Sequence, residues 1–169
     1  MLHGVCFDIG FIEINNPLIV VAVAIDIAAQ RRFAGAGSCF NQIHFSFPEE
    51  KILILGDACN NATFLFDENS LTVEEYRENL LQIQNRLEGR FDTTCLCHHV
   101  IWASKDMIHS VIEVCDTIMK DQADDVPFNF MGQQAFVAKK ANEYFNRLDG
   151  GEGNIIYSKE KIRKKEVTP

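Results

Sequence analysis

The sequence predicts one α/β domain in which a mixed or antiparallel sheet carries helices on one face. Residues 51–55 form a short apolar run that ends in Gly56-Asp57, and residues 94–97 form a second apolar run that ends in two histidines. Between them, residues 72–87 repeat apolar side chains at three- and four-residue spacing, which is typical of a helix that packs on a sheet. A chain of 169 residues is long enough for one domain with its own core.

Strands are expected through the first third of the chain. Four segments either alternate apolar and polar side chains or are rich in Val, Ile and Phe: residues 4–9, 11–14, 18–27 and 39–47. The alanines of 18–27 leave a helix open as the alternative for that segment. Residues 34–38, rich in Gly and Ala, predict a flexible loop, and Pro48-Glu49-Glu50 predicts a turn before the strand at 51–55.

The middle third predicts two helices separated by a strand. Thr72 and Glu75 have the spacing of a capping box, and Gly89 follows the last apolar position, so a helix is expected between them. Residues 91–97 then predict a strand. Ser104 is expected to cap a second helix, with Asp106 in its first turn.

The last third gives weaker signals. Residues 121–126 predict an acidic loop that stops before Pro127, residues 134–139 fit either a strand or a helix, residues 142–148 predict a helix, and residues 154–157 predict a short strand. Residues 158–169 are charged and are expected to form a frayed tail. The domain organisation is therefore one domain over 1–157 followed by a charged tail over 158–169.

Composition excludes several classes of protein. The net charge of -8 argues against binding nucleic acid through bulk charge. The apolar run 17–29 contains Asp26 and is shorter than the ~20 residues that a spanning helix needs, so no membrane segment is expected. The six cysteines are scattered and form no Cys-x-x-Cys pair, and no signal peptide is evident, so a reducing cytoplasm is the expected location.

Two strand ends carry residues that bind metals in proteins. Asp57 follows the strand at 51–55 and His98 follows the run at 94–97, so the pair suggests part of a metal site. Each also has a structural interpretation, because Asp after Gly often binds nearby backbone amides. Adjacent strand residues point to opposite faces, so at most one of His98 and His99 would join a given site. His44 and Cys59 are further candidates, the first also readable as a partly exposed strand histidine and the second as a buried thiol.

In order and spacing, residues 47–60, the helix from Thr72 and residues 91–98 resemble the C-terminal half of a metallo-β-lactamase-fold hydrolase. By this resemblance Asp57 matches the aspartate that bridges two metals and His98 matches the last histidine ligand. The implied fold is the second half of an αββα sandwich. The implied cofactor is zinc, or iron or manganese, with one or two ions in the parent family.

The chain also departs from the family pattern. It contains no His-x-His-x-Asp-His motif, which supplies four ligands in the family, and Ala34 stands where the family has a histidine before Gly-Ser. Asp57 and His98 are the only ligands that the resemblance leaves. One explanation is that the chain is a truncated or frame-disrupted descendant of a full-length hydrolase.

The resulting expectation is a metal-dependent hydrolase of small ester, thioester, amide or phosphoester substrates, incomplete and impaired, with Asp57 also orienting the attacking water. The alternative is a non-catalytic remnant or a small subunit that needs a partner chain, and a metal-binding module without turnover stands between the two. Half a sandwich leaves one apolar sheet face uncovered. We therefore expect a homodimer, a partner that supplies the missing half, or a rearranged fold in which residues 18–27 fill the gap.

Overall fold

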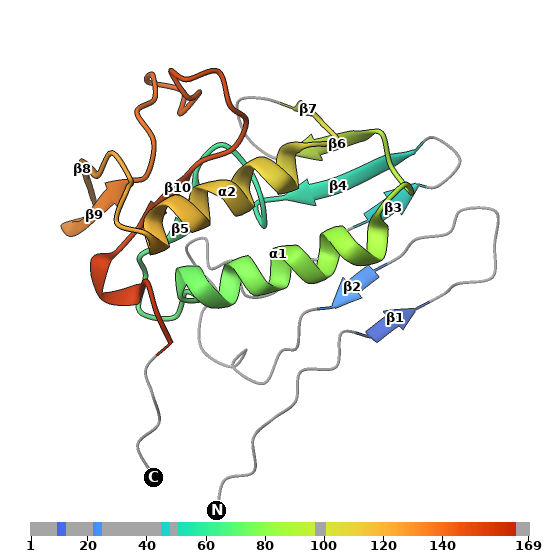
Figure 1. The fold of residues 1–169 in the computed structure, drawn as a ribbon, viewed down its shortest axis with the longest axis horizontal. Helices are drawn as coiled ribbons and strands as arrows, with labels where there is room; N and C mark the ends of the chain where they lie inside the picture. Colours follow the sequence, from blue (N-terminus) through green and yellow to red (C-terminus); the bar gives the residue numbers. More distant parts are fainter. Residues whose placement is uncertain (1–9, 13–21, 25–44, 48–50, 97–100, 165–169) are drawn as a thin grey trace, which may run out of the picture.

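A computed structural model describes residues 10–12, 22–24, 45–47, 51–96 and 101–164 (Figure 1). The elements run in the order β1 Gly10–Ile12, β2 Ala22–Ala24, β3 Phe45–Phe47, β4 Ile52–Gly56, β5 Thr63–Leu65, α1 Val73–Leu87, β6 Thr93–Leu96, β7 Trp102–Ser104, α2 Met107–Met119, β8 Val126–Phe130, β9 Gln133–Val137, β10 Ile155–Tyr157 and the short 3-10 helix η2 Lys159–Lys161. The mixture of strands and helices confirms the α/β class.

The strands form two mixed four-stranded sheets, with β1 and β2 as a separate antiparallel pair among the described residues. The first sheet has the order β3-β4-β6-β7, and its two central strands, β4 and β6, are parallel. The second has the order β5-β10-β9-β8, with β5 parallel to β10 and the other pairs antiparallel. The sequence predicted a single sheet, so this division is a difference from the expectation.

Helix α1 forms as the sequence predicts. The Thr72 hydroxyl accepts a hydrogen bond from the Glu75 amide, and the Glu75 carboxylate accepts one from the Thr72 amide, so the capping box is complete. At the other end Gly89 has φ +71, a conformation in which glycine is favoured after a helix. Helix α2 differs, because it starts at Met107 after Asp106, and Ser104 belongs to β7.

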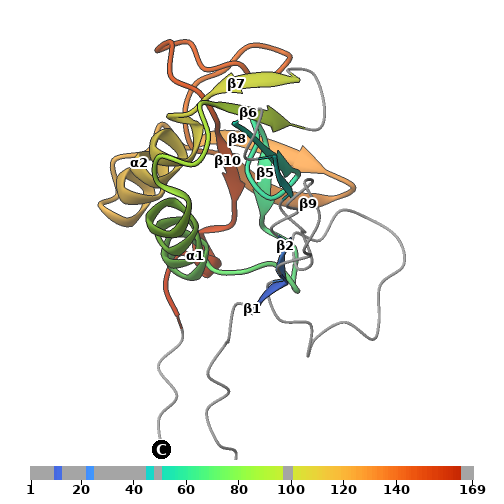
Figure 2. The same cartoon turned by 90° about the vertical axis from the view of Figure 1, so that its right-hand side faces the viewer.

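The main core lies between the helices and the strands. Both helices lie on the same side of the strands (Figure 2). Leu53, Leu55 and Leu96 from the first sheet and Leu65, Ile155 and Tyr157 from the second belong to one cluster with the buried stripes of α1 and α2. The two sheets therefore share a single helix-side core, and burial of its apolar area is the main stabilising contribution.

The opposite side of the second sheet carries a separate aromatic cluster. Ile156, Val137 and Ala135 form its buried floor, and the side chains packed around them include Phe64, Phe66, Phe128 and Phe145. Ring centroids in this group, which we call the aromatic face, lie 5.1–6.5 Å apart when Phe130 is included. These rings are only partly buried, and Phe130 is 38% exposed.

Of two predictions for the last third, the helix is wrong, and the loop is present but ends one residue early, because β8 begins at Val126. Residues 142–148 form no helix, because the Asn142 side chain accepts hydrogen bonds from the amides of Tyr144 and Asn146, and Phe145 has φ +60. The predicted loop at 121–126 ends where β8 begins, and β8 contains Pro127. A proline is compatible with this strand because β8 is at the edge of its sheet.

The C-terminal segment is fastened to the body of the protein as far as residue 164. The Lys161 ammonium donates hydrogen bonds to the carbonyls of Asp67, Glu68 and Ser70 at 2.7, 2.9 and 2.5 Å, just ahead of α1. The Lys164 amide and ammonium bind Glu74 and Glu78 on α1. Residues 158–164 are therefore not frayed as expected.

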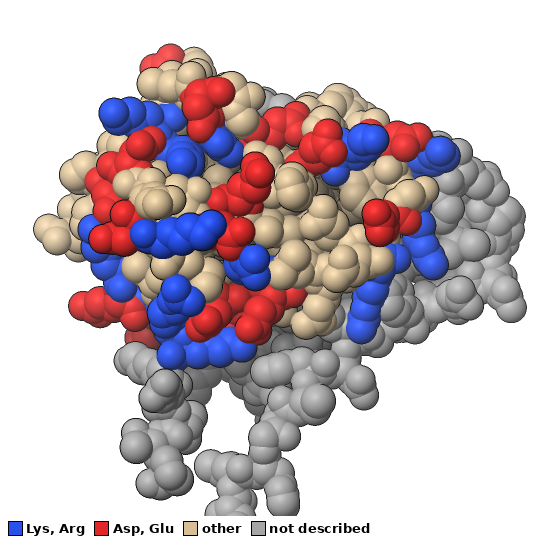
Figure 3. Space-filling view, viewed as in Figure 1, with Lys and Arg blue, Asp and Glu red and all other residues tan. Residues whose placement is uncertain are grey.

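The helix side of the molecule is charged, with acidic and basic side chains interspersed (Figure 3). One ion pair, Arg77 with Asp116, joins α1 to α2 at 2.5 Å and raises the pKa of the Arg77 guanidinium. Of the helices that the structure describes, neither has the length and apolar content needed to cross a lipid bilayer.

Candidate functional site

Asp57 lies where β4 ends, at one edge of the first sheet. Strands β4 and β6 are parallel, and Gly56 is in register with Leu96. Because the carboxyl ends of parallel strands meet at the same edge, Asp57 follows β4 at the edge where β6 ends with Leu96. This is the arrangement that the two strand-end motifs predicted for Asp57.

The Asp57 carboxylate is oriented by a buried asparagine. The Asn60 side chain donates a hydrogen bond from Nδ2 to Asp57 Oδ1 at 3.3 Å, while its Oδ1 accepts one from the Ala62 amide at 2.7 Å. The Asn60 backbone amide donates to Thr63 Oγ1 at 3.2 Å. Asn60 is almost fully buried, so its amide group is held in one orientation.

A loop from far along the chain supports the turn that follows Asp57. Asn61 donates from Nδ2 to Asn146 Oδ1 at 2.9 Å and accepts from the Gly153 amide at 3.3 Å. The Asn154 amide donates to the carbonyl of Asn60 at 3.2 Å. The turn is therefore held by the segment between β9 and β10 as well as by its own hydrogen bonds.

Cys59 lies in the helix-side core rather than beside the carboxylate. Its side chain is fully buried, and burial raises the pKa of the thiol to about 12, although a hydrogen bond with Tyr76 acts in the opposite direction. A neutral thiol in apolar surroundings is a poor metal ligand, since the thiolate is the form that binds. The structure therefore favours the buried-thiol interpretation of Cys59.

The remaining candidates cannot be placed around Asp57. His98, His99, His44 and Ala34 lie outside the described residues. His109 is on the exposed side of α2, where its Nε2 lies 3.5 Å from a carboxylate oxygen of Glu113. Among the described residues, no three His, Cys, Asp or Glu side chains come together as a group that could hold a metal ion. The described residues alone do not fit the ligand set of a catalytic zinc.

Large apolar side chains are exposed next to the same edge of the sheet. Ile101 is 61% and Trp102 is 57% exposed, and Trp102 pairs with Cys95 across the β6–β7 hairpin. Leu53 and Leu55 of β4 face the helices, so the alternating residue Ile54 faces the other way, and register places Cys95 and Trp102 in its row. This face of the first sheet is apolar and incompletely covered.

Sequence reasoning did not pair the asparagines that hold the turn after Asp57 with one another. Asn60, Asn61, Asn146 and Asn154 come from two segments far apart in the sequence. The local signals, an Asn-Asn pair after Gly-Asp-Ala-Cys and a Gly-Asn before a strand, indicate turns but not their partners.

No protein-family model and no curated protein matches the chain.

Proposed function

We propose that this chain is one half of a metal-dependent hydrolase of the metallo-β-lactamase type, with Asp57 as a metal ligand and His98 as a second one. The observation that carries the proposal is the register of β4 with β6, in which Gly56, just before Asp57, lies beside Leu96, the last described residue before His98. Substrates would be small esters, thioesters, amides or phosphoesters, and the location would be a reducing cytoplasm.

The arrangement of the layers supports the family assignment in this proposal. A parallel β4–α1–β6 unit leads to the strand that precedes His98, and both helices lie on one side of the strands. The other side carries the aromatic face and the row of Ile54, Cys95 and Trp102. An incompletely covered apolar side is what half of a two-sheet sandwich would present.

We further propose that a partner completes the site, either a second copy of this chain or a chain that carries the missing half. A catalytic zinc takes three protein ligands and a water. Asp57 is one ligand among the described residues, and His98 would be a second, so at least one more has to come from elsewhere. The partner would cover the aromatic face at the same time.

The second candidate function is a non-catalytic subunit or remnant. It is favoured by the lack of a three-residue ligand group in the described part of the chain. The bond from Asn60 to Asp57 also suits a purely structural carboxylate that organises a turn.

Metal content of the purified chain separates the two candidates. Asp57→Ala and His98→Ala would be compared by inductively coupled plasma mass spectrometry with Asp92→Ala and His109→Ala, which change an exposed carboxylate and an exposed imidazole elsewhere. Near one zinc, iron or manganese per chain, lost only in the first two variants, supports the metal site. Equal and negligible metal in all five proteins supports the non-catalytic subunit.

The partner part of the proposal has its own test. Light scattering coupled to size-exclusion chromatography would show a dimer of the chain, and Phe128→Asp in the aromatic face would convert it to a monomer. A parent chain that is already a compact monomer would argue against the second copy, and the missing-half partner would remain.

A further inference from the structure

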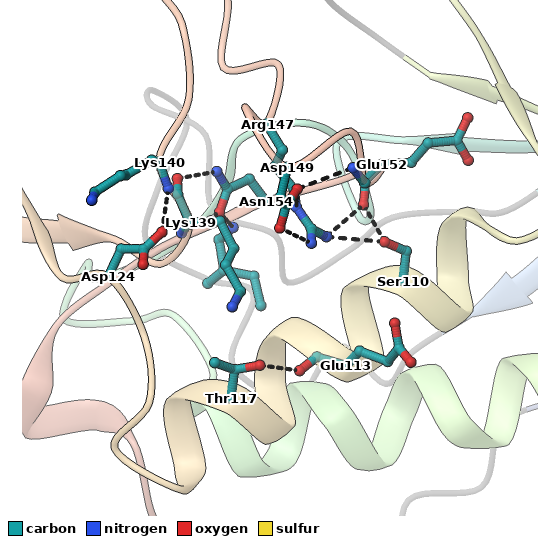
Figure 4. A network of polar contacts seen from close by, with 12 residues as sticks. Ser110, Glu113, Thr117, Asp124, Lys139, Lys140, Arg147, Asp149, Glu152 and Asn154 are labelled. Atoms are coloured by element: carbon teal, nitrogen blue, oxygen red, sulfur yellow. Dashed lines mark hydrogen bonds and ion pairs between the residues drawn. The ribbon is translucent and has the colours of Figure 1, made fainter.

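A groove on the helix side is lined by three basic side chains, Lys120, Lys139 and Arg147. It has a volume of about 360 Å³ and runs between the second half of α2 and the segment that joins β9 to β10. Lys139 and Arg147 line it from that segment, and Thr117 lines it from α2 (Figure 4). Lys120, the residue after α2, also lines it. The volume is that of a site for a small ligand.

One wall of the groove is rigidly built around Arg147. Its guanidinium forms two hydrogen bonds with Asp149, at 2.8 and 2.6 Å, and two more with Ser110 Oγ and the Glu152 carbonyl, at 3.0 and 3.3 Å. A Cβ on Gly151 would clash with this guanidinium, so Arg147 would have to shift to admit a side chain there. Arg147 therefore joins this loop to α2, and its guanidinium already donates to Asp149, Ser110 and the Glu152 carbonyl.

Lys139 extends from a backbone that is held on both sides. Its amide donates to Asn154 Oδ1 at 3.1 Å, and its carbonyl accepts from Asn154 Nδ2 at 2.8 Å. The Lys139 side chain extends toward α2, whereas that of Lys140 extends away from the groove (Figure 4). The neighbouring lysine thus provides an internal control with the same charge.

Two carboxylates at the groove have other partners, and the two lysines form no close ion pair within the described residues, although Lys139 contributes to lowering the pKa of Asp149. Asp116 is paired with Arg77 at 2.5 Å, and Glu113 is 67% exposed and lies beside His109. Within the described residues, neither Lys120 nor Lys139 has a carboxylate oxygen within 4.0 Å. Two ammonium groups that share one polar groove would be stabilised by an anion between them.

The chemistry of the groove favours a phosphate group. Lysine binds phosphate as a point charge, whereas recognition of a planar carboxylate favours a free arginine fork, which Arg147 cannot offer because Asp149 holds it. Polar side chains such as Gln122 and Thr117 at the groove suit a hydrated anion better than an apolar ligand.

We propose that this groove binds a phosphate dianion, either free or as the ester of a small metabolite, through Lys120 and Lys139. The proposal does not depend on the metal-dependent activity, because it concerns different side chains, Lys120 and Lys139.

Titration of the full chain with inorganic phosphate and with glycerol 3-phosphate, at an ionic strength held constant with sodium chloride, tests the proposal. Isothermal calorimetry gives the affinity, and ¹H–¹⁵N correlation spectra locate the perturbed amides. Lys139→Met and Lys120→Met should each weaken binding roughly tenfold, since each removes one charge-assisted hydrogen bond. Lys140→Met should bind as the parent chain does.

The outcomes are distinct. Equal affinity for the two ligands assigns the site to the phosphate group itself, and tighter binding of the ester assigns it to a phosphorylated metabolite. No saturable binding to the parent chain would overturn the proposal, and so would equal weakening in Lys140→Met, because the effect would then be one of bulk charge. Circular dichroism of each variant checks that the chain is folded.

Discussion

The two sides of the strands differ in how completely they are buried. On the helix side, Leu53, Leu55, Ile155 and Tyr157 are at most 2% exposed and pack against both helices. On the other side, the rings of the aromatic face are partly exposed around a floor of three small or aliphatic residues. The difference indicates that the helix side supplies most of the stability of this chain. The other side is suited to binding a second protein surface.

The largest expected contrast is in cysteine reactivity. Iodoacetamide at pH 7.5 should modify Cys95, which is partly exposed, faster than Cys59 by orders of magnitude, because burial raises the pKa of the Cys59 thiol to about 12 and removes its thiolate. Peptide mass spectrometry of the folded chain measures both rates. Comparable rates would mean that the two sides are equally accessible.

Truncation of a core side chain should separate the two sides in stability. Leu55→Ala should lower the free energy of unfolding by about 2–5 kcal/mol, as full burial in a well-packed core implies. Phe128→Ala should cost only about 1–2 kcal/mol, because a half-buried ring loses less contact area. Urea denaturation measures both, and a larger loss for Phe128→Ala would reverse the comparison.

Two glycines in the loop between β9 and β10 separate the cost of backbone strain from the cost of packing against α2. Gly153 and Gly150 both have positive φ, but a Cβ on Gly153 would clash with Val111 of α2, whereas one on Gly150 would meet open space. Gly150→Ala should cost about 1–2 kcal/mol from backbone strain alone. Gly153→Ala should cost about 1–3 kcal/mol more, because α2 would have to move. Thermal unfolding of the pair isolates the packing contribution.

The capping box gives a smaller effect. Thr72→Ala should destabilise the chain by about 1 kcal/mol, since it removes the hydrogen bond to the Glu75 amide. Thr117→Ala is a suitable control, because its hydroxyl donates to a carbonyl within α2 and caps nothing. Equal losses in the two variants would argue against a specific role for the cap.

The smallest effect concerns acid stability. The Arg147 guanidinium holds the pKa of Asp149 below its usual range, so the unfolded chain binds more protons than the folded chain when pH falls below about 4. Stability from this carboxylate is therefore present above that pH and is lost as pH falls further. The Asp149→Asn variant should be less stable than the parent at neutral pH, and its free energy of unfolding should fall less as the pH is lowered. Urea midpoints at several pH values measure the difference.

The local elements were predictable where one signal dominated. The capping box located the start of α1, and apolar runs located β4, β6 and β10. The alternatives left open at residues 134–139 resolve to a strand, β9, because it pairs with β8 and β10, and neither partner is visible in a local window. Strand β8 was not predicted because it contains Pro127. A proline is tolerated in a strand at the edge of a sheet, and the sequence alone does not show which strand lies at the edge.

For the candidate site, the sequence predicted that Asp57 would lie at a strand end but not what holds it there. The asparagines that position the turn come from segments separated by more than eighty residues, as in the bond from Asn61 to Asn146. The expected helix at 142–148 failed for a related reason, because Asn142 binds the backbone amides that a helix would have used. A side chain that binds backbone amides in place of helical hydrogen bonds leaves no trace in the spacing of apolar residues along the sequence.

The contact of Lys161 with the loop before α1 has a consequence for biosynthesis. The carbonyls of Asp67, Glu68 and Ser70 converge on an ammonium group that the ribosome adds more than ninety residues later. During translation these carbonyls must be hydrated, and the entry to α1 lacks this outer support until Lys161 has been added. A nascent chain arrested before Lys161 would therefore carry a loosened first helix, and residues 158–164 complete the contacts of the helix side.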